Sequence, residues 1–194
     1  MPSYPHIDRY HADLQRFRDF GGSDNEQSIR RAFAVCLDSY CRDHREKLAL
    51  VDELDAGAGS RSTGTRNRPD GTVKDSLRMA RGYWEAKDTR DDLDAEIQAK
   101  FNRGYPRDNI LFEDSQTAVL IQNGNEAMRV DMSRPGELHR LIRRFLDYEL
   151  PEIEEFRQAR QQFKADLPAV LESLRVFVKD QMTQMVHSTH NAPD

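Results

Sequence analysis

Tyr83-Trp84-Glu85-Ala86-Lys87 is a short stretch in which charged and small or aromatic side chains alternate. Because side chains two residues apart share one face of a strand, the alternation predicts a strand with Glu85 and Lys87 pointing the same way. A carboxylate beside an ammonium group suits a site that holds a metal ion and a phosphate. The other interpretation is a surface ion pair on an edge strand.

The triplet needs support from its surroundings, because one acid-x-lysine triplet is expected by chance in a charged chain of this length. Pro69-Asp70 stands fifteen residues upstream, at the start of a second expected strand over residues 70–74. If the two strands pair antiparallel, Asp70 comes close to Glu85. Mg²⁺ takes hard oxygen ligands and keeps waters, so Asp70, Glu85 and the Ala86 carbonyl form a plausible partial set of ligands.

In this interpretation Lys87 orients the attacking water or stabilises the charge that develops on the phosphate. Asp75 competes with Asp70 for the first metal position. An error of register would exchange the two, and the sequence leaves the choice between Asp70 and Asp75 open.

Outward from this centre, the chain reads as a helix, a strand-rich middle with one helix, and then further helices. The expected helices cover residues 24–44, 91–102, 137–149 and 153–186, and the expected strands cover residues 48–54, 70–74, 83–87, 109–112, 117–122 and 127–131. This order predicts an α/β core with a helical C-terminal extension. We expect an N-terminal arm over 1–22, the core over 23–134, and an extension or linker over 135–194.

The bulk composition excludes a chain coated in basic residues. Its 194 residues are 37% hydrophobic and 32% charged, and the formal net charge is −5. A local basic stripe nevertheless runs from Arg61 to Arg90, a segment that contains eight Lys or Arg residues and four Asp or Glu residues. From this stripe we expect contacts to DNA phosphates by Arg66, Arg68, Lys74, Arg78 and Arg81. A solvated surface is the alternative.

Cysteine use and hydropathy bear on location. Cys36 and Cys41 form neither a metal-ligand spacing nor a disulfide framework, which predicts reduced thiols. No stretch approaches eighteen apolar residues, and mean hydropathy is −0.84. The N-terminus has no secretion signal. These features predict a soluble cytoplasmic protein with no membrane partner.

Several segments together resemble the N-terminal Mrr-like PD-(D/E)xK nuclease domain of Type ISP restriction-modification enzymes. The similarity runs from about Ser23 to the helices past Leu150. The segments that carry it are Asn25-Glu-Gln-Ser-Ile-Arg-Arg-Ala-Phe33, Arg68-Pro-Asp-Gly-Thr-Val-Lys-Asp75, Gly82-Tyr-Trp-Glu-Ala-Lys-Asp88, Leu93-Asp-Ala-Glu-Ile-Gln98, Asn109-Ile-Leu-Phe-Glu-Asp114 and Ala118-Val-Leu-Ile-Gln-Asn-Gly124.

The resemblance implies a restriction-endonuclease-like core, with a mixed central sheet flanked by helices. It implies a Mg²⁺-dependent endodeoxyribonuclease, with Mn²⁺ as a substitute, and Asp70, Glu85 and Lys87 as catalytic residues. Glu26 would be an auxiliary metal-binding acid, or else an ordinary acid at a helix N-terminus. Gln98 would face the site as an auxiliary residue, or else be an ordinary core or surface glutamine.

In that family the nuclease domain is fused to helicase-like, methyltransferase and target-recognition domains, which are absent from these 194 residues. The resemblance implies DNA as the substrate and helicase and methyltransferase domains as fused or associated partners. It leaves dimerisation on DNA open, because the sequence does not reveal whether double-strand cleavage needs a second copy. The alternative function is an inactive nuclease-fold module that binds DNA or a partner protein.

Overall fold

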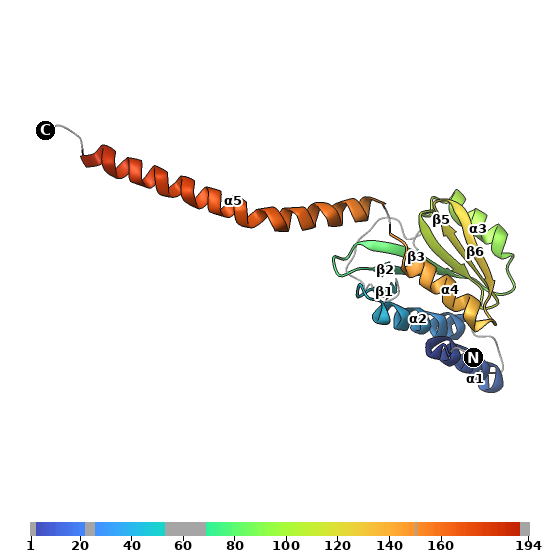
Figure 1. Ribbon diagram of the computed structural model, residues 1–194. Helices are drawn as coiled ribbons and strands as arrows, with labels where there is room; N and C mark the ends of the chain where they lie inside the picture. Colours follow the sequence, from blue (N-terminus) through green and yellow to red (C-terminus); the bar gives the residue numbers. More distant parts are fainter. Residues whose placement is uncertain (1–2, 22–25, 53–68, 150, 191–194) are drawn as a thin grey trace. The chain divides into compact units, whose positions relative to one another are not determined.

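The computed structural model describes residues 3–21, 26–52, 69–149 and 151–190 (Figure 1). The chain divides into two compact units, Met1–Glu149 and Leu150–Asp194. The first unit contains every strand of the described residues and all the residues discussed below as a site. The second consists of one long helix, α5 (Pro151–His190), which continues through Pro168.

A six-stranded sheet forms the centre of the first unit. Its strands lie in chain order and are β1 (Ala49–Asp52), β2 (Gly71–Lys74), β3 (Ala80–Ala86), β4 (Asn109–Glu113), β5 (Thr117–Gln122) and β6 (Asn125–Asp131). All neighbouring strands pair antiparallel except β3 and β4, which are parallel. A parallel pair needs a crossover, and α3 (Leu93–Asn102) supplies it. The predicted mixed sheet is therefore present.

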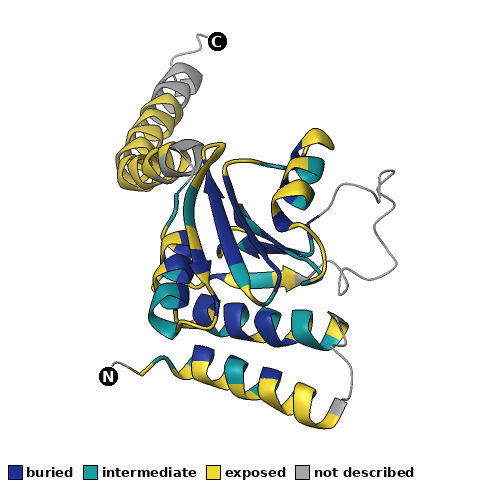
Figure 2. Cartoon of the chain, turned by 90° about the vertical axis from the view of Figure 1, so that its right-hand side faces the viewer, coloured by how far each residue is buried: buried dark blue, intermediate teal, exposed yellow. Residues whose placement is uncertain are grey.

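Helices cover both faces of this sheet. On one face lie α1 (Pro5–Gly21), α2 (Glu26–Asp43) and α4 (Pro135–Leu146), which share a core with Trp84 of β3 and Leu111 of β4. Figure 2 shows α2 between α1 and the sheet. On the other face α3 packs over a second core from β4 and β5. Residues that alternate along β3 and β4 thus point into two different layers.

The compact unit is larger than the predicted core of residues 23–134, so both domain boundaries need correction. In α1, Ile7, Tyr10 and Leu14 repeat at helical spacing and are buried, so residues 1–22 do not form a separate arm. In α4, Leu138 and Ile142 are fully buried against the sheet. Both helices belong to the core because their apolar faces need cover, which α2 and α4 provide for α1 and the sheet provides for α4.

Local predictions agree more closely with the structure. Asn123-Gly124 is a turn signal in the sequence; both residues have positive φ angles, 51° and 76°, and they join β5 to β6 in a two-residue turn. Cys36 and Cys41 are free and buried, and burial raises the pKa of each thiol to about 12. Within the described residues, no helix has the length and apolar character that a bilayer crossing requires.

Candidate active site

Two carboxylates lie side by side where β2 begins and β3 ends. Gly71 of β2 pairs with Trp84 of β3, so the next residues outward from that pair, Asp70 and Glu85, are neighbours across the antiparallel strands. Asp70 Oδ2 accepts a hydrogen bond of 2.9 Å from the backbone amide of Ala86. The strand pairing therefore brings Asp70 to Glu85, as the sequence predicted.

The environment of Asp70 combines burial with nearby charges of both signs. Burial raises the pKa of its carboxyl above the usual value, and the negative charge of Glu85 raises it further. The Ala86 amide, Arg30 and Lys87 oppose this shift. Arg30 reaches from α2, and its Nη1 lies 3.2 Å from Asp70 Oδ1. The raised pKa means that ionising Asp70 in the folded chain costs more free energy than in water, and a bound cation would reduce this cost.

Glu85 is almost fully buried, with 2% of its surface exposed, on the face of the sheet that α3 covers. Its Oε1 lies 3.0 Å from Lys87 Nζ and also contacts Lys100 Nζ. Its Oε2 accepts a hydrogen bond of 3.3 Å from the Tyr105 hydroxyl. A buried carboxylate requires such partners, because an isolated charge would be expensive to bury.

Helix α3 supplies part of this arrangement. Asp92 caps its N-terminus by accepting from the amides of Asp94 and Ala95. Glu96 and Lys100 lie four residues apart and so share one side of the helix. Glu96 Oε2 lies 3.2 Å from Lys87 Nζ, and Lys100 Nζ lies 3.0 Å from the Tyr105 hydroxyl.

A second buried acid, Glu113 at the end of β4, lies close to the same strand end. Its backbone carbonyl accepts from the Lys87 amide at 2.8 Å. Its Oε2 accepts from the Ser115 amide, while among the described residues Oε1 has no hydrogen-bond partner. Burial raises the pKa of Glu113 to about 8. A pocket beside it is lined by Arg30, Ala86, Lys87 and Ser115 among others.

The residues at the strand end fit a hard divalent cation of the Mg²⁺ type. Asp70 and Glu85 offer carboxylate oxygens, and the negative charge of Glu85 raises the cost of ionising Asp70, which a cation would lower. Within residues 3–21, 26–52, 69–149 and 151–190, no group of three or more His, Cys, Asp or Glu side chains forms a metal cage. A cation here would therefore keep several waters, as Mg²⁺ does in proteins.

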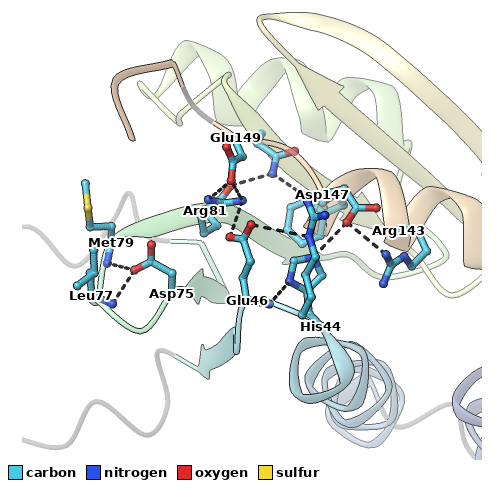
Figure 3. A network of polar contacts seen from close by, with 12 residues as sticks. His44, Glu46, Asp75, Leu77, Met79, Arg81, Arg143, Asp147 and Glu149 are labelled. Atoms are coloured by element: carbon cyan, nitrogen blue, oxygen red, sulfur yellow. Dashed lines mark hydrogen bonds and ion pairs between the residues drawn. The ribbon is translucent and has the colours of Figure 1, made fainter. Parts of the chain in front are cut away.

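Of the three auxiliary candidates from the sequence, two lie away from this point. Asp75 caps the turn between β2 and β3, where its Oδ1 accepts from the amides of Leu77 and Met79 (Figure 3). Gln98 is exposed on α3, two residues from both Glu96 and Lys100 and so on another side of the helix. The side chain of Glu26 lies outside the described residues.

Arg81 corrects the predicted set of DNA-binding residues. Its side chain is 1% exposed; its guanidinium lies 3.1 Å from Glu149 and 3.5 Å from Glu46 (Figure 3). A phosphate cannot reach a cation enclosed in this way. Of the others, Arg78 is exposed in the hairpin turn and Lys74 is half-buried on β2, while Arg66 and Arg68 lie outside the described residues.

Four residues of the site were not predicted: Arg30, Glu96, Lys100 and Tyr105. The four-residue spacing of Glu96 and Lys100 indicates a shared helix side, but many helices carry such pairs. Nothing local links Arg30 or Tyr105 to β3, because their contacts depend on how α2 and the segment after α3 pack on the sheet.

Among the comparisons with known proteins, the comparison with solved structures gives a match. No protein-family model matches the chain, and no curated protein matches it. A solved structure, the cryo-EM structure of a DrdV–DNA complex, matches with a TM-score of 0.70 and 40% sequence identity. The match covers 92% of this chain and 17% of the DrdV chain, so this chain spans a small part of that protein's length. The fold is restriction-endonuclease-like, which confirms the predicted fold class.

Proposed function

We propose that this chain is a Mg²⁺-dependent endonuclease module that hydrolyses phosphodiester bonds in DNA. The observation that carries the proposal is the meeting of Asp70 and Glu85 at one strand end, with the Lys87 ammonium 3.0 Å from the Glu85 carboxylate. The fold is shared with DrdV, a protein whose structure was solved in complex with DNA. The sequence resemblance further suggests the Mrr-like PD-(D/E)xK class of Type ISP enzymes, with helicase and methyltransferase domains as fused or associated partners.

Asp70, Glu85 and the carbonyl of Ala86 are the groups that would hold the metal ion. When bound, Mg²⁺ polarises the scissile phosphate and lowers the pKa of an attacking water. The hydrogen bond from the Ala86 amide orients the Asp70 carboxylate before any ligand arrives. Such preorganisation lowers the cost of bringing the two carboxylates to one ion.

Lys87 provides a positive charge beside these carboxylates. The Lys87 side chain is only 12% exposed, so the field of its ammonium group is weakly screened by solvent. In the proposed reaction it orients the attacking water or stabilises negative charge on the phosphate oxygens. In this proposal Arg30, beside Asp70, and Arg78, exposed in the hairpin turn, add contacts to the DNA backbone.

Cleavage of supercoiled plasmid DNA tests the proposal. The parent chain is expected to nick or linearise the plasmid with Mg²⁺ or Mn²⁺ and to be inactive with EDTA. Lys87→Met and Glu85→Gln are each expected to slow cleavage by about 10²-fold or more. Lys164→Met and Glu172→Gln, on the exposed surface of α5, are the matched controls and should cut like the parent.

Equal cleavage by the parent and both site variants would reject this active site. A parent chain that retards DNA in a gel but does not cut with either metal would favour the inactive DNA-binding module instead. Calorimetric titration with Mn²⁺ adds a readout that does not depend on cleavage.

A further inference from the structure

The Glu85 carboxylate already has cationic partners at the position where a metal ion would bind. Oε1 contacts two ammonium groups, those of Lys87 and Lys100, and Oε2 accepts from the Tyr105 hydroxyl. A carboxylate oxygen has two lone pairs, so Oε1 has no acceptor capacity left. A metal ion that binds Glu85 through this oxygen must displace one of the two lysines.

The two lysines differ in how else their charges are balanced. Lys87 also contacts a second carboxylate, with its Nζ 3.2 Å from Glu96 Oε2. The other contacts of Lys100 among the described residues are to Tyr105, whose hydroxyl lies 3.0 Å and whose ring centroid lies 4.7 Å from Lys100 Nζ. Within the described residues, Glu85 is thus the one carboxylate in contact with the Lys100 ammonium.

Tyr105 gives Lys100 a place to remain when Glu85 is taken by another cation. Its hydroxyl can accept from the ammonium, and its ring attracts a cation across its face. Release from Glu85 therefore does not require Lys100 to move into solvent. A lysine that keeps the Tyr105 contact avoids the cost of a desolvated charge with no partner at all.

The local charges also show why the lysine opposes a metal ion. Arg30, Lys87 and Lys100 carry three positive charges, and among the described residues they contact the carboxylates of Asp70, Glu85 and Glu96. A divalent cation entering this cluster experiences the repulsion of a nearby ammonium group. Removal of the Lys100 charge leaves the carboxylates in excess.

We propose that Lys100 is the resident counter-ion of Glu85, that a divalent cation displaces it on binding Glu85 through Oε1, and that it thereby sets the metal affinity of the site. Lys100 acts through Glu85 and is a positioning residue. The inference rests on the proposed function, because it assumes that Glu85 binds a metal ion. In the metal-free chain Lys100 keeps the buried Glu85 charge paired.

Mn²⁺ binding without DNA tests this role directly. Titration followed by calorimetry, with free Mn²⁺ measured by electron paramagnetic resonance, gives Kd for the parent chain, Lys100→Met and Lys100→Arg. Lys100→Met keeps the length of the side chain and removes its charge, so Kd should fall by about tenfold or more. Lys100→Arg keeps the charge and should remain within about twofold of the parent. Lys164→Met, on α5, is the matched control.

The outcomes separate the two proposals. An unchanged or weaker Mn²⁺ affinity in Lys100→Met, with the parent binding normally, overturns the counter-ion role and leaves the nuclease proposal standing. No Mn²⁺ binding by the parent or by Lys100→Met overturns both. If circular dichroism shows that Lys100→Met does not fold, Lys100→Gln replaces it, with the same expected direction and the same overturning result.

Discussion

Asp70 Oδ2 accepts a 2.9 Å hydrogen bond from the amide of Ala86, which joins the first carboxylate of the site to the strand that carries the second. The contact depends on the antiparallel register of β2 and β3. Because both acids stand on paired strands, the site is held by backbone hydrogen bonds and not by flexible side chains alone. Substitutions at the site are therefore expected to change the stability of the fold as well as the binding of a metal ion.

Asp70→Asn should stabilise the fold while it abolishes metal binding. Burial and the charge of Glu85 raise the pKa of Asp70, so the Asp70 carboxyl binds its proton more tightly in the folded chain than in the unfolded chain. The free energy of unfolding therefore decreases as pH rises from the pKa of Asp70 in the unfolded chain to its pKa in the folded chain. Asparagine keeps an acceptor for the Ala86 amide and has no charge. At pH 8 we expect Tm to rise, by about 2–4 °C for each kcal/mol gained.

Thermal melts of Asp70→Asn and the parent over a range of pH check this expectation. The difference in Tm should shrink towards pH 3, below the ordinary aspartate pKa of about 3.9. A lower Tm for Asp70→Asn at pH 8 would contradict it and would mean that the Arg30 contact outweighs the cost of burying the charge.

Glu113 should make the parent chain less stable as pH increases. Burial raises its pKa from 4.5 to about 8, so between these values the folded state holds a proton that the unfolded state has lost. Stability due to this group is complete below pH 4.5, falls up to about pH 8 and is level above that. Glu113→Gln should remove this part of the slope, measured by urea denaturation at several pH values. Exposed Glu172→Gln is the control; an identical slope in Glu113→Gln would refute the prediction.

Arg81→Ala should unfold the chain more easily without weakening its contact with DNA. The substitution removes the buried guanidinium that contacts Glu149 and Glu46, and loss of one member of a buried ion pair costs about 3 kcal/mol or more. The urea midpoint should fall accordingly. Arg78→Ala, in the exposed turn, should change stability by less than about 0.5 kcal/mol.

Fluorescence anisotropy with labelled DNA, at a temperature where all variants are folded, completes the comparison. We expect Arg81→Ala to bind DNA like the parent and Arg78→Ala to bind more weakly. The reverse order would restore Arg81 to the DNA-binding set.

Gly82→Ala should disturb the packing of β3. A Cβ atom at this position would lie 2.5 Å from Phe145 Cε2 and 2.6 Å from Asn109 Nδ2. Phe145 is buried and Asn109 is held by hydrogen bonds to the carbonyls of Arg81 and Phe145, so neither side chain can move freely. Overpacking of this kind costs about 1–3 kcal/mol or more.

Gly136→Ala in α4 is a suitable control for that substitution. Its Cβ would meet Tyr4 Oη at 3.4 Å, an ordinary contact, and alanine favours a helix. Differential scanning calorimetry should show a lower Tm for Gly82→Ala and an equal or higher one for Gly136→Ala. Equal melting of the two variants would contradict the close approach of α4 to β3.

The strand from Tyr83 to Ala86 shows how far local pattern predicts the site. Alternation of side chains is a property of the strand itself, so the sequence alone predicts that Glu85 and Trp84 lie on opposite faces. Asp70 required one further step, the pairing of β2 with β3. Sequence left Asp75 as its competitor, and the register of the two strands together with the hairpin turn separates them.

Arg81 shows where such prediction ends. In the sequence it is one arginine in a basic stripe, with nothing to distinguish it from Arg78. Its burial depends on Glu46 from the segment after α2 and on Glu149 from the segment after α4. The charge pattern gives the order of charged residues along the chain. It does not predict the tertiary packing that buries Arg81 and leaves Arg78 exposed.

The sequence by itself determined the alternation of β3, the turn at Asn123-Gly124, the amphipathic helices and the pairing of an acid with a lysine at Glu85 and Lys87. These depend on neighbours within a few residues, whose geometry follows from the backbone period. Only the tertiary structure decided that Lys100 also contacts Glu85. That contact arises because α3 connects the parallel strands β3 and β4 and packs over one face of the sheet. The repeat of side chains along a helix or strand does not determine where such a connection places Lys100.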